Sequence, residues 1–293
     1  MSEATVRITP PYREEIIREV ETTGFGVVER PLSRWTRLLD NGVFRKFLIL
    51  VVLALAWEGY ARWSGNPLLF PTFVATVEAF FRGIANGSLI SATWTSISLL
   101  LQGYAAGLVI AALFTAFASA TRVGADLLET LTSMFNPLPS IALLPLSMIW
   151  FGLGNLSIIF VLIHAVLWAV ALNTHSGFRS VSMTWRMVGR NYGLSGLPYV
   201  CKILIPGAFP SILTGMKIGW AFAWRTLIAA ELVFGSSSGS GGLGWYIFQN
   251  KNMLDIPNVF AGLLTVILFG LFVENLIFRV VERRTISRWG MQN

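Results

Sequence analysis

The stretch Leu156–Phe178, which reads LSIIFVLIHAVLWAVALNTHSGF, decides the fold of this chain. It contains no aspartate, glutamate, lysine or arginine over 23 residues. A helix of that length rises about 35 Å, which is enough to cross the hydrocarbon layer of a bilayer, about 30 Å thick. The sequence therefore predicts a membrane-spanning helix at this position.

Five further apolar stretches lie on either side of it. One of them is interrupted by Pro137, Pro139 and Pro145, which free backbone carbonyls and predict a break inside the membrane. The chain is therefore predicted to be an all-α, polytopic membrane protein of about six spans: Phe47–Trp63, Thr95–Ser119, Leu127–Phe151, Leu156–Phe178, Ile212–Val233 and Val259–Val281.

The composition supports the same fold class. Hydrophobic residues make up 54% of the 293 residues and charged residues 13%, about half the share of an ordinary soluble domain. The net charge of +7 does not indicate nucleic-acid binding, because the chain lacks a soluble basic face. The single cysteine, Cys201, excludes an intramolecular disulfide and a multi-cysteine metal site. No cleavable signal peptide is expected, because the first apolar run begins only at Phe47.

The distribution of Lys and Arg predicts the orientation. With the N-terminus in the cytoplasm, eighteen of them fall in inner segments and three, Arg62, Arg82 and Lys251, fall in outer segments. Arg225 lies within a span. Because inner loops of membrane proteins are enriched in Lys and Arg, both termini are predicted to be cytoplasmic.

Three segments outside the spans have distinct patterns. Residues 1–46 form a polar cytoplasmic arm, either disordered or lying on the membrane surface, and residues 47–293 form the transmembrane domain. A short amphipathic external helix is predicted at about 72–85, with Glu78 and Arg82 paired one turn apart. The run Ser236–Leu243 is predicted to be a flexible external loop and not a phosphate cradle, because no Lys-Ser/Thr follows it.

The connection between the fourth and fifth spans, residues 180–211, is far longer than a simple turn requires. It reads SVSMTWRMVGRNYGLSGLPYVCKILIPGAFPS and predicts a basic, amphipathic helix, a bend at Gly193 and a second short run that ends at Pro206. Such a unit suits docking in a groove of a soluble partner. The alternative is a helix that lies on anionic lipid.

This loop resembles the cytoplasmic signature loop of ABC-importer permeases, in which Glu-Ala-Ala is followed by three residues, Gly, nine residues and Ile-x-Leu-Pro. Gly193 takes the glycine position, and Ile203, Ile205 and Pro206 take positions of the last motif. The positions of Glu, Ala and Ala hold Met187, Val188 and Gly189. Without the glutamate, we expect docking to rely more on shape and apolar contact than on charge.

The resemblance extends over roughly residues 65–290 and is closest to the nitrate/sulfonate/taurine/bicarbonate branch of these permeases. The blocks that carry it are Pro137-Leu-Pro139, Leu144-Pro145-Leu146, WFGLG at 150–154, NTHSG at 173–177, WRTLIAAEL at 224–232, GGLGW at 241–245, and Glu282-Arg283-Arg284 with Trp289-Gly290. The family implies a type I importer bundle that passes a small solute, such as a sulfonate, taurine or nitrate, across the bacterial inner membrane by alternating access.

The resemblance also implies the partners. These are two cytoplasmic ABC ATPases, a second permease copy in a homodimer, an external substrate-binding protein and the lipid bilayer, with no nucleic acid. The permease is then not an enzyme and holds no cofactor or metal, because ATP and Mg²⁺ bind to the ATPases. The residues expected to form the docking loop are Arg186, Met187, Gly189, Arg190, Gly193, Ile203, Ile205 and Pro206.

The translocation pathway should be lined by groups that are costly in lipid. The candidates are Asn136, Pro137, Pro139, Ser140, His164, Asn173, Arg225 and Glu231, with His175, Glu274 and Asn275 as further polar positions. The break at Asn136–Ser140 is either a gate or a packing kink. Arg225 either attracts an anionic substrate or forms an ion pair with an acid such as Glu274. The two histidines lie about 16 Å apart along one helix and cannot share a metal; a structural hydrogen bond is expected for each.

Two other function classes share some of these features. An ion-coupled secondary transporter would also have buried charges, but it should show internal repeats and needs no thirty-residue loop. A membrane-embedded enzyme would need a nucleophile–base set or a metal cluster at depth, and the sequence offers only scattered serines and two isolated histidines.

Overall fold

The structure of the protein is a computed structural model that describes residues 41–234 and 241–285. The described residues are helical, with short connections and no strand. The chain separates into two compact units, Met1–Leu53 and Ala54–Asn293. In the first unit, the structure describes only the beginning of α2 (Gly42–Ser64). Most of the predicted arm (1–46), part of the predicted loop Ser236–Leu243, and Trp289 with Gly290 lie outside the described residues.

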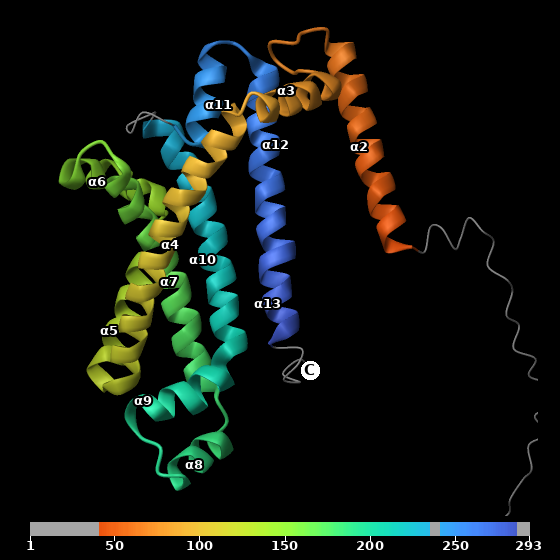
Figure 1. Cartoon of the computed structure of the whole chain (residues 1–293). Coiled ribbons are helices and arrows are strands. Elements are labelled where there is room, and N and C mark those ends of the chain that lie inside the picture. Colours follow the sequence, from red (N-terminus) through yellow and green to blue (C-terminus); the bar gives the residue numbers. More distant parts are fainter. Residues whose placement is uncertain (1–40, 235–240, 286–293) are drawn as a thin grey trace, which may run out of the picture. The chain divides into compact units, whose positions relative to one another are not determined.

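The second unit holds the remaining helices, and Figure 1 shows α3 and α11 at one end of its long helices and α8 with α9 at the other. These ends match the segments predicted to be external and cytoplasmic; which end faces the cytoplasm stays a prediction. The elements are α3 (Phe73–Ala85), α4 (Ser88–Ala120), α5 (Arg122–Phe135), η1 (Ser140–Leu143), α6 (Leu144–Phe151), α7 (Asn155–Ser180), α8 (Met183–Asn191), α9 (Gly196–Tyr199), η2 (Val200–Leu204), α10 (Ile205–Phe234), α11 (Leu243–Asn252), α12 (Ile256–Phe272), η3 (Val273–Phe278) and α13 (Arg279–Arg284).

The helix that contains the opening stretch, α7, is the central element, and α4 packs closely against it. Gly103 and Gly107 of α4 form a Gly-x-x-x-Gly pair against α7. A methyl carbon at Gly103 would stand 2.5 Å from Cβ of Leu162, and one at Gly107 would stand 2.7 Å from Cβ of Val166. Small residues at this spacing let two helix backbones approach closely, which is how helices associate in a bilayer.

A second Gly-x-x-x-Gly pair approaches α7 from α10. A methyl carbon at Gly215 would stand 2.8 Å from Cβ of Asn173, and one at Gly219 would stand 3.2 Å from Cγ2 of Val170. The two glycine pairs therefore hold α7 between α4 and α10. Both pairs are visible in the sequence, but the spacing of hydrophobic residues alone did not single them out.

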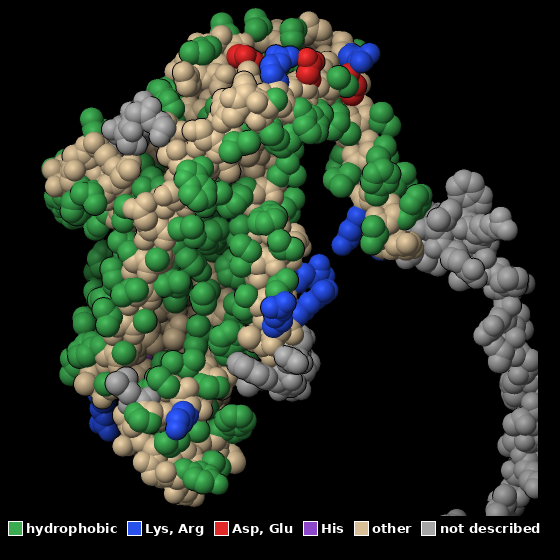
Figure 2. All heavy atoms as spheres, viewed as in Figure 1, with side chains coloured by type: hydrophobic (Ala, Val, Ile, Leu, Met, Phe, Trp, Pro, Cys, Tyr) green, Lys and Arg blue, Asp and Glu red, His purple; other side chains and the backbone are tan. Residues whose placement is uncertain are grey.

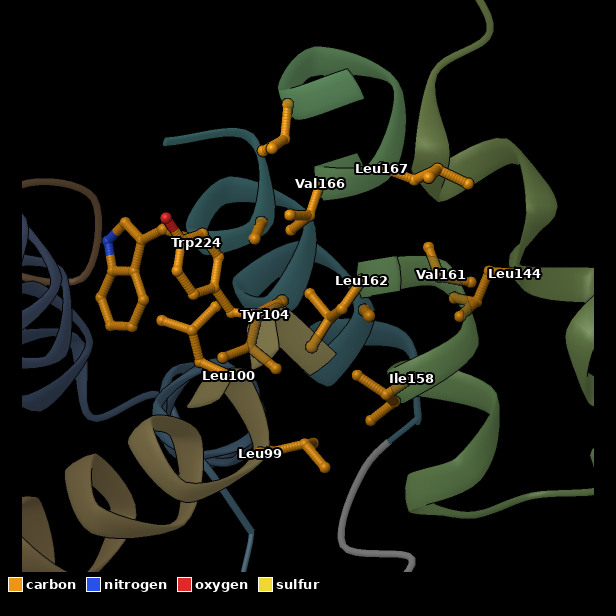
Figure 3. Packing of buried hydrophobic residues seen from close by; sticks show 14 of the residues in the cluster. Leu99, Leu100, Tyr104, Leu144, Ile158, Val161, Leu162, Val166, Leu167 and Trp224 are labelled. Atoms are coloured by element: carbon orange, nitrogen blue, oxygen red, sulfur yellow. The ribbon is translucent and has the colours of Figure 1, made fainter. Parts of the chain in front are cut away.

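The core of the second unit surrounds this three-helix contact. Figure 3 shows Leu100 and Tyr104 of α4 packed near Leu162 of α7, with Trp224 of α10 close by. The Tyr104 hydroxyl donates a hydrogen bond of 3.0 Å to the carbonyl of Met216, so its one polar group is satisfied within the apolar core. The polar link fixes the register of α4 against α10.

By length and hydropathy, three helical segments of the described part could each cross a membrane: Ser88–Ala120, Asn155–Ser180 and Ile256–Arg284. The pair Arg122–Phe135 and Ser140–Phe151 adds a fourth if it is one broken span. The other two predicted spans are also helical, as α2 and α10, but fall outside this set. The ionised residues of α10 lower its hydropathy. The multi-pass helical fold is confirmed, and the count of six stays a prediction.

The predicted amphipathic helix at 72–85 is α3. Thr72 caps its N-terminus by accepting the Ala75 N–H at 3.1 Å, and Glu78 pairs with Arg82 at 2.6 Å as the spacing predicted. Trp57 joins this segment to α2 by donating from Nε1 to the Pro71 carbonyl at 2.9 Å. On the face in view in Figure 2, hydrophobic side chains cover the long helices and the visible acidic side chains cluster around α3.

The start of the fifth predicted span needs a correction. The sequence predicted a loop to residue 211, whereas α10 begins at Ile205 and includes Pro206 and Pro210. The π-helical turn η2 comes directly before it, and the Ile205 N–H bonds to the Val200 carbonyl five residues back. Because a π turn widens the helix, it can accommodate prolines that lack an N–H to donate.

Candidate functional site: two cavities along one helix

The proline-containing segment after α5 sets the position of the site. The N–H of Asn136 still bonds to the Thr132 carbonyl at 2.9 Å, but Pro137 and Pro139 have no N–H and the α-helix ends. The helices on either side of the break, Arg122–Phe135 and Ser140–Phe151, are bent by 89° from each other. The predicted interruption of this span is therefore a sharp corner in the backbone.

The inner side of this corner lines a first cavity of about 350 Å³. Six of the eight predicted pathway residues meet there, from α5, η1, α7 and α10: Asn136, Pro137, Pro139, Ser140, His164 and Arg225. Ser140 Oγ lies 3.1 Å from His164 Nδ1, so the structural hydrogen bond predicted for this histidine is present. The ring of Phe135 stacks on Trp168 at 5.4 Å and forms an aromatic wall.

Arg225 supplies the only ionised side chain among the described residues that line the first cavity. Its guanidinium lies 5.8 Å from the centre of the Phe222 ring. Of the two alternatives for Arg225, the ion pair with an acid such as Glu274 is not formed, because no carboxylate of the described residues lies within 4.0 Å of Arg225. Both residues line a third cavity of about 300 Å³, beside Lys217, but they do not meet. Arg225 thus carries a positive charge that is not paired with any acid of residues 41–234 and 241–285.

A second cavity, also of about 350 Å³, lies further along α7, and Asn136 and Pro137 line both cavities. The remaining lining residues come from α5 and α7: Leu128, Glu129, Thr132, Ser133, Leu172, His175, Ser176 and Arg179. The two cavities therefore adjoin at the proline corner, because both are lined by Asn136 and Pro137.

Buried polar atoms without partners single out these two cavities. Such atoms are rare in folded proteins, because leaving a buried donor or acceptor unpaired costs about 1–3 kcal/mol. Five side chains of the described part carry one. Four of them line the cavities: His164 Nε2 and Trp168 Nε1 the first, Thr132 Oγ1 and His175 Nδ1 the second. The residues that carry these atoms line the cavities, while the atoms themselves are buried.

The lining residues of α7 follow one helical stripe, which we call the α7 stripe: His164, Trp168, Leu172, His175 and Arg179. Steps of three and four residues place them on one face. The stripe runs for about 22 Å along the helix at 1.5 Å per residue. The two histidines therefore lie several turns apart on the stripe. The described residues contain no group of three or more His, Cys, Asp or Glu side chains that could hold a metal ion.

Two predicted pathway residues lie elsewhere. Asn173 is off the α7 stripe: its amide donates to the Ala169 carbonyl at 2.7 Å, and its Cβ packs beside Gly215. Glu231 is buried and lines neither cavity. Sequence position alone did not reveal which face of each helix these residues occupy. A helical projection from His164 would have excluded Asn173.

Glu231 instead organises the end of the bundle where α11 begins. Its carboxylate accepts hydrogen bonds from Ser96 Oγ at 2.8 Å and from the Gly244 N–H at 2.9 Å. Ser96 Oγ in turn accepts the Leu243 N–H at 2.8 Å. A carboxylate at a helix N-terminus bonds to amides that have no partner within the helix. The acid thus ties α4, α10 and α11 together.

The other end of α7 is attached to the predicted docking loop through Arg186. This α8 side chain donates from Nε to the Val181 carbonyl at 3.1 Å and from Nη2 to the Phe178 carbonyl at 2.5 Å. The last carbonyls of a helix lack intrahelical partners and favour positive charge. The place of Arg186 in the predicted docking loop stays a prediction; in the structure its guanidinium fastens α8 to the end of α7.

Two glycines shape the loop as well. Gly193 has φ +70°, and the N–H groups of Gly193 and Leu194 bond back to the carbonyls of Arg190 and Gly189 at 2.9 and 3.0 Å. These bonds form a Schellman motif, which gives the predicted bend a defined geometry. Gly189 packs against η2, where a methyl carbon would stand 2.8 Å from Cγ1 of Ile203.

Several hydrophobic side chains of α8 and of Tyr192, which follows it, are exposed. We call them together the α8 face: Met183, Trp185, Met187, Val188 and Tyr192, with exposures from 46% to 81%. Of the other predicted docking residues, Arg190 and Gly193 are exposed, whereas Ile203 and Pro206 are partly buried. An apolar patch of this kind, bordered by polar residues, is typical of a protein or membrane contact.

Comparison with known proteins identifies similar chains. The sequence pattern of the family described as binding-protein-dependent transport system inner membrane component matches residues 103–287. A Methanocaldococcus jannaschii protein that carries the name of an ABC transporter permease is 31% identical over 233 residues, covering 78% of this chain and 86% of that protein. The taurine transport system permease protein of Escherichia coli K12 is 29% identical over 268 residues, covering 87% and 93%. The nitrate import permease protein of Synechocystis is 26% identical over 242 residues, covering 80% and 86%.

Proposed function

Because this chain belongs to the family of binding-protein-dependent transport system inner membrane components, we propose that it is the permease of an ATP-driven importer for a small anion. The family makes the chain a membrane component of a transporter rather than an enzyme. The proposal adds the route of the solute and the place where the ATPase acts. It includes a location in a bacterial inner membrane, a second permease copy and an external binding protein.

The attachment of α8 to α7 carries this proposal. Arg186 joins the helix that bears the exposed α8 face to the helix that bears the α7 stripe. An ATPase that docks on the α8 face and moves it would move the lining of both cavities without an intermediate joint. Alternating access requires such a link between the site of ATP use and the path of the solute.

The first cavity supports an anion as the solute. It combines the unpaired guanidinium of Arg225 with two unpartnered ring nitrogens, His164 Nε2 and Trp168 Nε1. No carboxylate lines it among the described residues. The guanidinium and the Trp168 indole N–H are donors that match the oxygens of a sulfonate, nitrate or carboxylate. The names of the Escherichia coli and Synechocystis relatives refer to the transport of taurine and nitrate.

The docking step can be tested on the purified complex of permease, ATPases and binding protein. Val188→Asp places a charge on the α8 face and should lower ATPase copurification at least about tenfold, because an ion replaces an apolar contact. Val123→Asp is the matched control, since Val123 is an exposed valine at the start of α5, outside the α8 face. Equal copurification of both variants would remove α8 as the docking site.

The solute step is tested separately in proteoliposomes. Arg225→Gln should reduce uptake strongly while leaving ATPase copurification unchanged. Unchanged uptake with lowered thermal stability would instead make Arg225 a structural residue. Uptake by the permease without ATPases, driven by an ion gradient alone, would support the secondary-transporter alternative and overturn the proposal.

A further inference from the structure

The second cavity differs from the first in its charges. The first has one cation and no acid among its described lining residues, whereas the second has Glu129 on α5 and Arg179 on α7. We propose that the second cavity is a separate station for a small zwitterion, with Glu129 contacting its cationic group and Arg179 its anionic group. The proposal rests on the proposed passage of a solute along α7.

The two charges are free to contact a ligand. Within the described residues, Glu129 and Arg179 form no ion pair within 4.0 Å with each other or with any other group. The side chains of Glu129 and Arg179 also make no hydrogen bond to the described residues. An acid and a base that face one small cavity without pairing leave room between them for a molecule that carries both opposite charges.

The walls between the charges supply neutral polar groups. Thr132 and His175 line the cavity, and each carries one buried atom, Oγ1 and Nδ1, without a hydrogen-bond partner in the described part. Ser133, Ser176 and Asn136 add further polar lining. The cavity volume of about 350 Å³ suits a molecule of a few heavy atoms.

The same pair of charges disfavours singly charged solutes. A simple anion would be attracted by Arg179 and repelled by Glu129, and a simple cation would meet the reverse. Asp126, one turn before Glu129 on α5, does not line the second cavity. The second cavity therefore discriminates by requiring both charges at once, whereas the first attracts any small anion.

Direct binding to the purified full-length permease in nanodiscs tests the proposal without a binding protein or ATPase. Three probes differ by one group each: taurine carries an ammonium and a sulfonate, isethionate replaces the ammonium by a hydroxyl, and ethanolamine replaces the sulfonate by a hydroxyl. Saturation-transfer NMR titrations should show taurine binding at least about tenfold more tightly than either, the factor that one charge-assisted hydrogen bond gives.

Two variants assign that preference to this cavity. Glu129→Gln keeps the shape of the side chain and should bring taurine to the affinity of isethionate. Asp126→Asn is the matched control on the same helix and should keep the preference. Equal binding of the three probes, binding of none, or loss of preference in both variants would overturn the station. Failure of the proposed function would appear elsewhere, as unchanged ATPase copurification in Val188→Asp.

Discussion

The bond between Arg186 and the end of α7 gives the sharpest prediction. Arg186→Gln removes both hydrogen bonds to the carbonyls of Phe178 and Val181. Arg186→Lys keeps the positive charge but loses the planar guanidinium that reaches two carbonyls at once. Arg190→Gln is the control, because Arg190 is exposed one turn further along α8 and its side chain makes no hydrogen bond to the described residues.

The magnitude follows from the two contacts. A hydrogen bond from a charged donor contributes about 1.5–3 kcal/mol, and Arg186 makes two. The side chain is only partly buried, so water compensates for part of the loss. We therefore expect the attachment of α8 to weaken by about 2 kcal/mol in Arg186→Gln, which is about a 30-fold change in a local opening equilibrium.

Hydrogen–deuterium exchange measures that opening. In nanodiscs, amides of α8 and of the last turn of α7 should exchange about 30-fold faster in Arg186→Gln and by an intermediate factor in Arg186→Lys. They should be unchanged in Arg190→Gln. In the assembled complex, solute-stimulated ATP hydrolysis should fall in the same order. Unchanged exchange in Arg186→Gln would refute the attachment, and faster exchange with normal coupling would refute its role in transmission.

Three further changes test the packing. Glu231→Ala should lower the free energy of unfolding by about 3 kcal/mol, measured by thermal unfolding, because it leaves Ser96 Oγ and the Gly244 N–H without an acceptor; an unchanged unfolding temperature contradicts the network. Gly103→Val should cost about 1–3 kcal/mol through its clash with α7, whereas Gly59→Val meets nothing within 4 Å and should be neutral in the same assay. Gly193→Ala should lower ATP-dependent uptake, because alanine at this positive φ costs about 1 kcal/mol of strain. Gly193→Asn should recover uptake, because asparagine adopts this conformation more readily; equal uptake in both variants would show that the bend does not depend on φ.

Six residues that line the first cavity could be named from the sequence because their signals are chemical. Prolines break a helix wherever they occur, so Pro137 and Pro139 indicated the corner without knowledge of the fold. Charged or imidazole side chains in a span are costly, so His164 and Arg225 pointed to a cavity. The family was predicted from a different signal, several short blocks of residues that occur in one order along the chain.

The sequence did not predict the direction and the hydrogen-bond partners of two of these side chains. Glu231 is as costly in lipid as Arg225, but its cost is met by Ser96, which lies 135 residues earlier in the chain. Arg186 matched a docking motif by position, yet its guanidinium turns back onto the carbonyls of α7. Such long-range or backward contacts depend on the packing of helices, and a single sequence does not specify them. The second cavity was missed because Glu129 and Arg179 lie near the ends of their predicted spans, where charge is ordinary.

One consequence follows from the α7 stripe being carried by a single unbroken helix. A helix with side chains has a radius of about 5 Å, so a turn of about 30° about its axis would carry each stripe side chain about 3 Å sideways. His164 and Arg179, at opposite ends of the stripe, would turn through the same angle at the same time. A rotation of α7 about its own axis would therefore change the width of both cavities together.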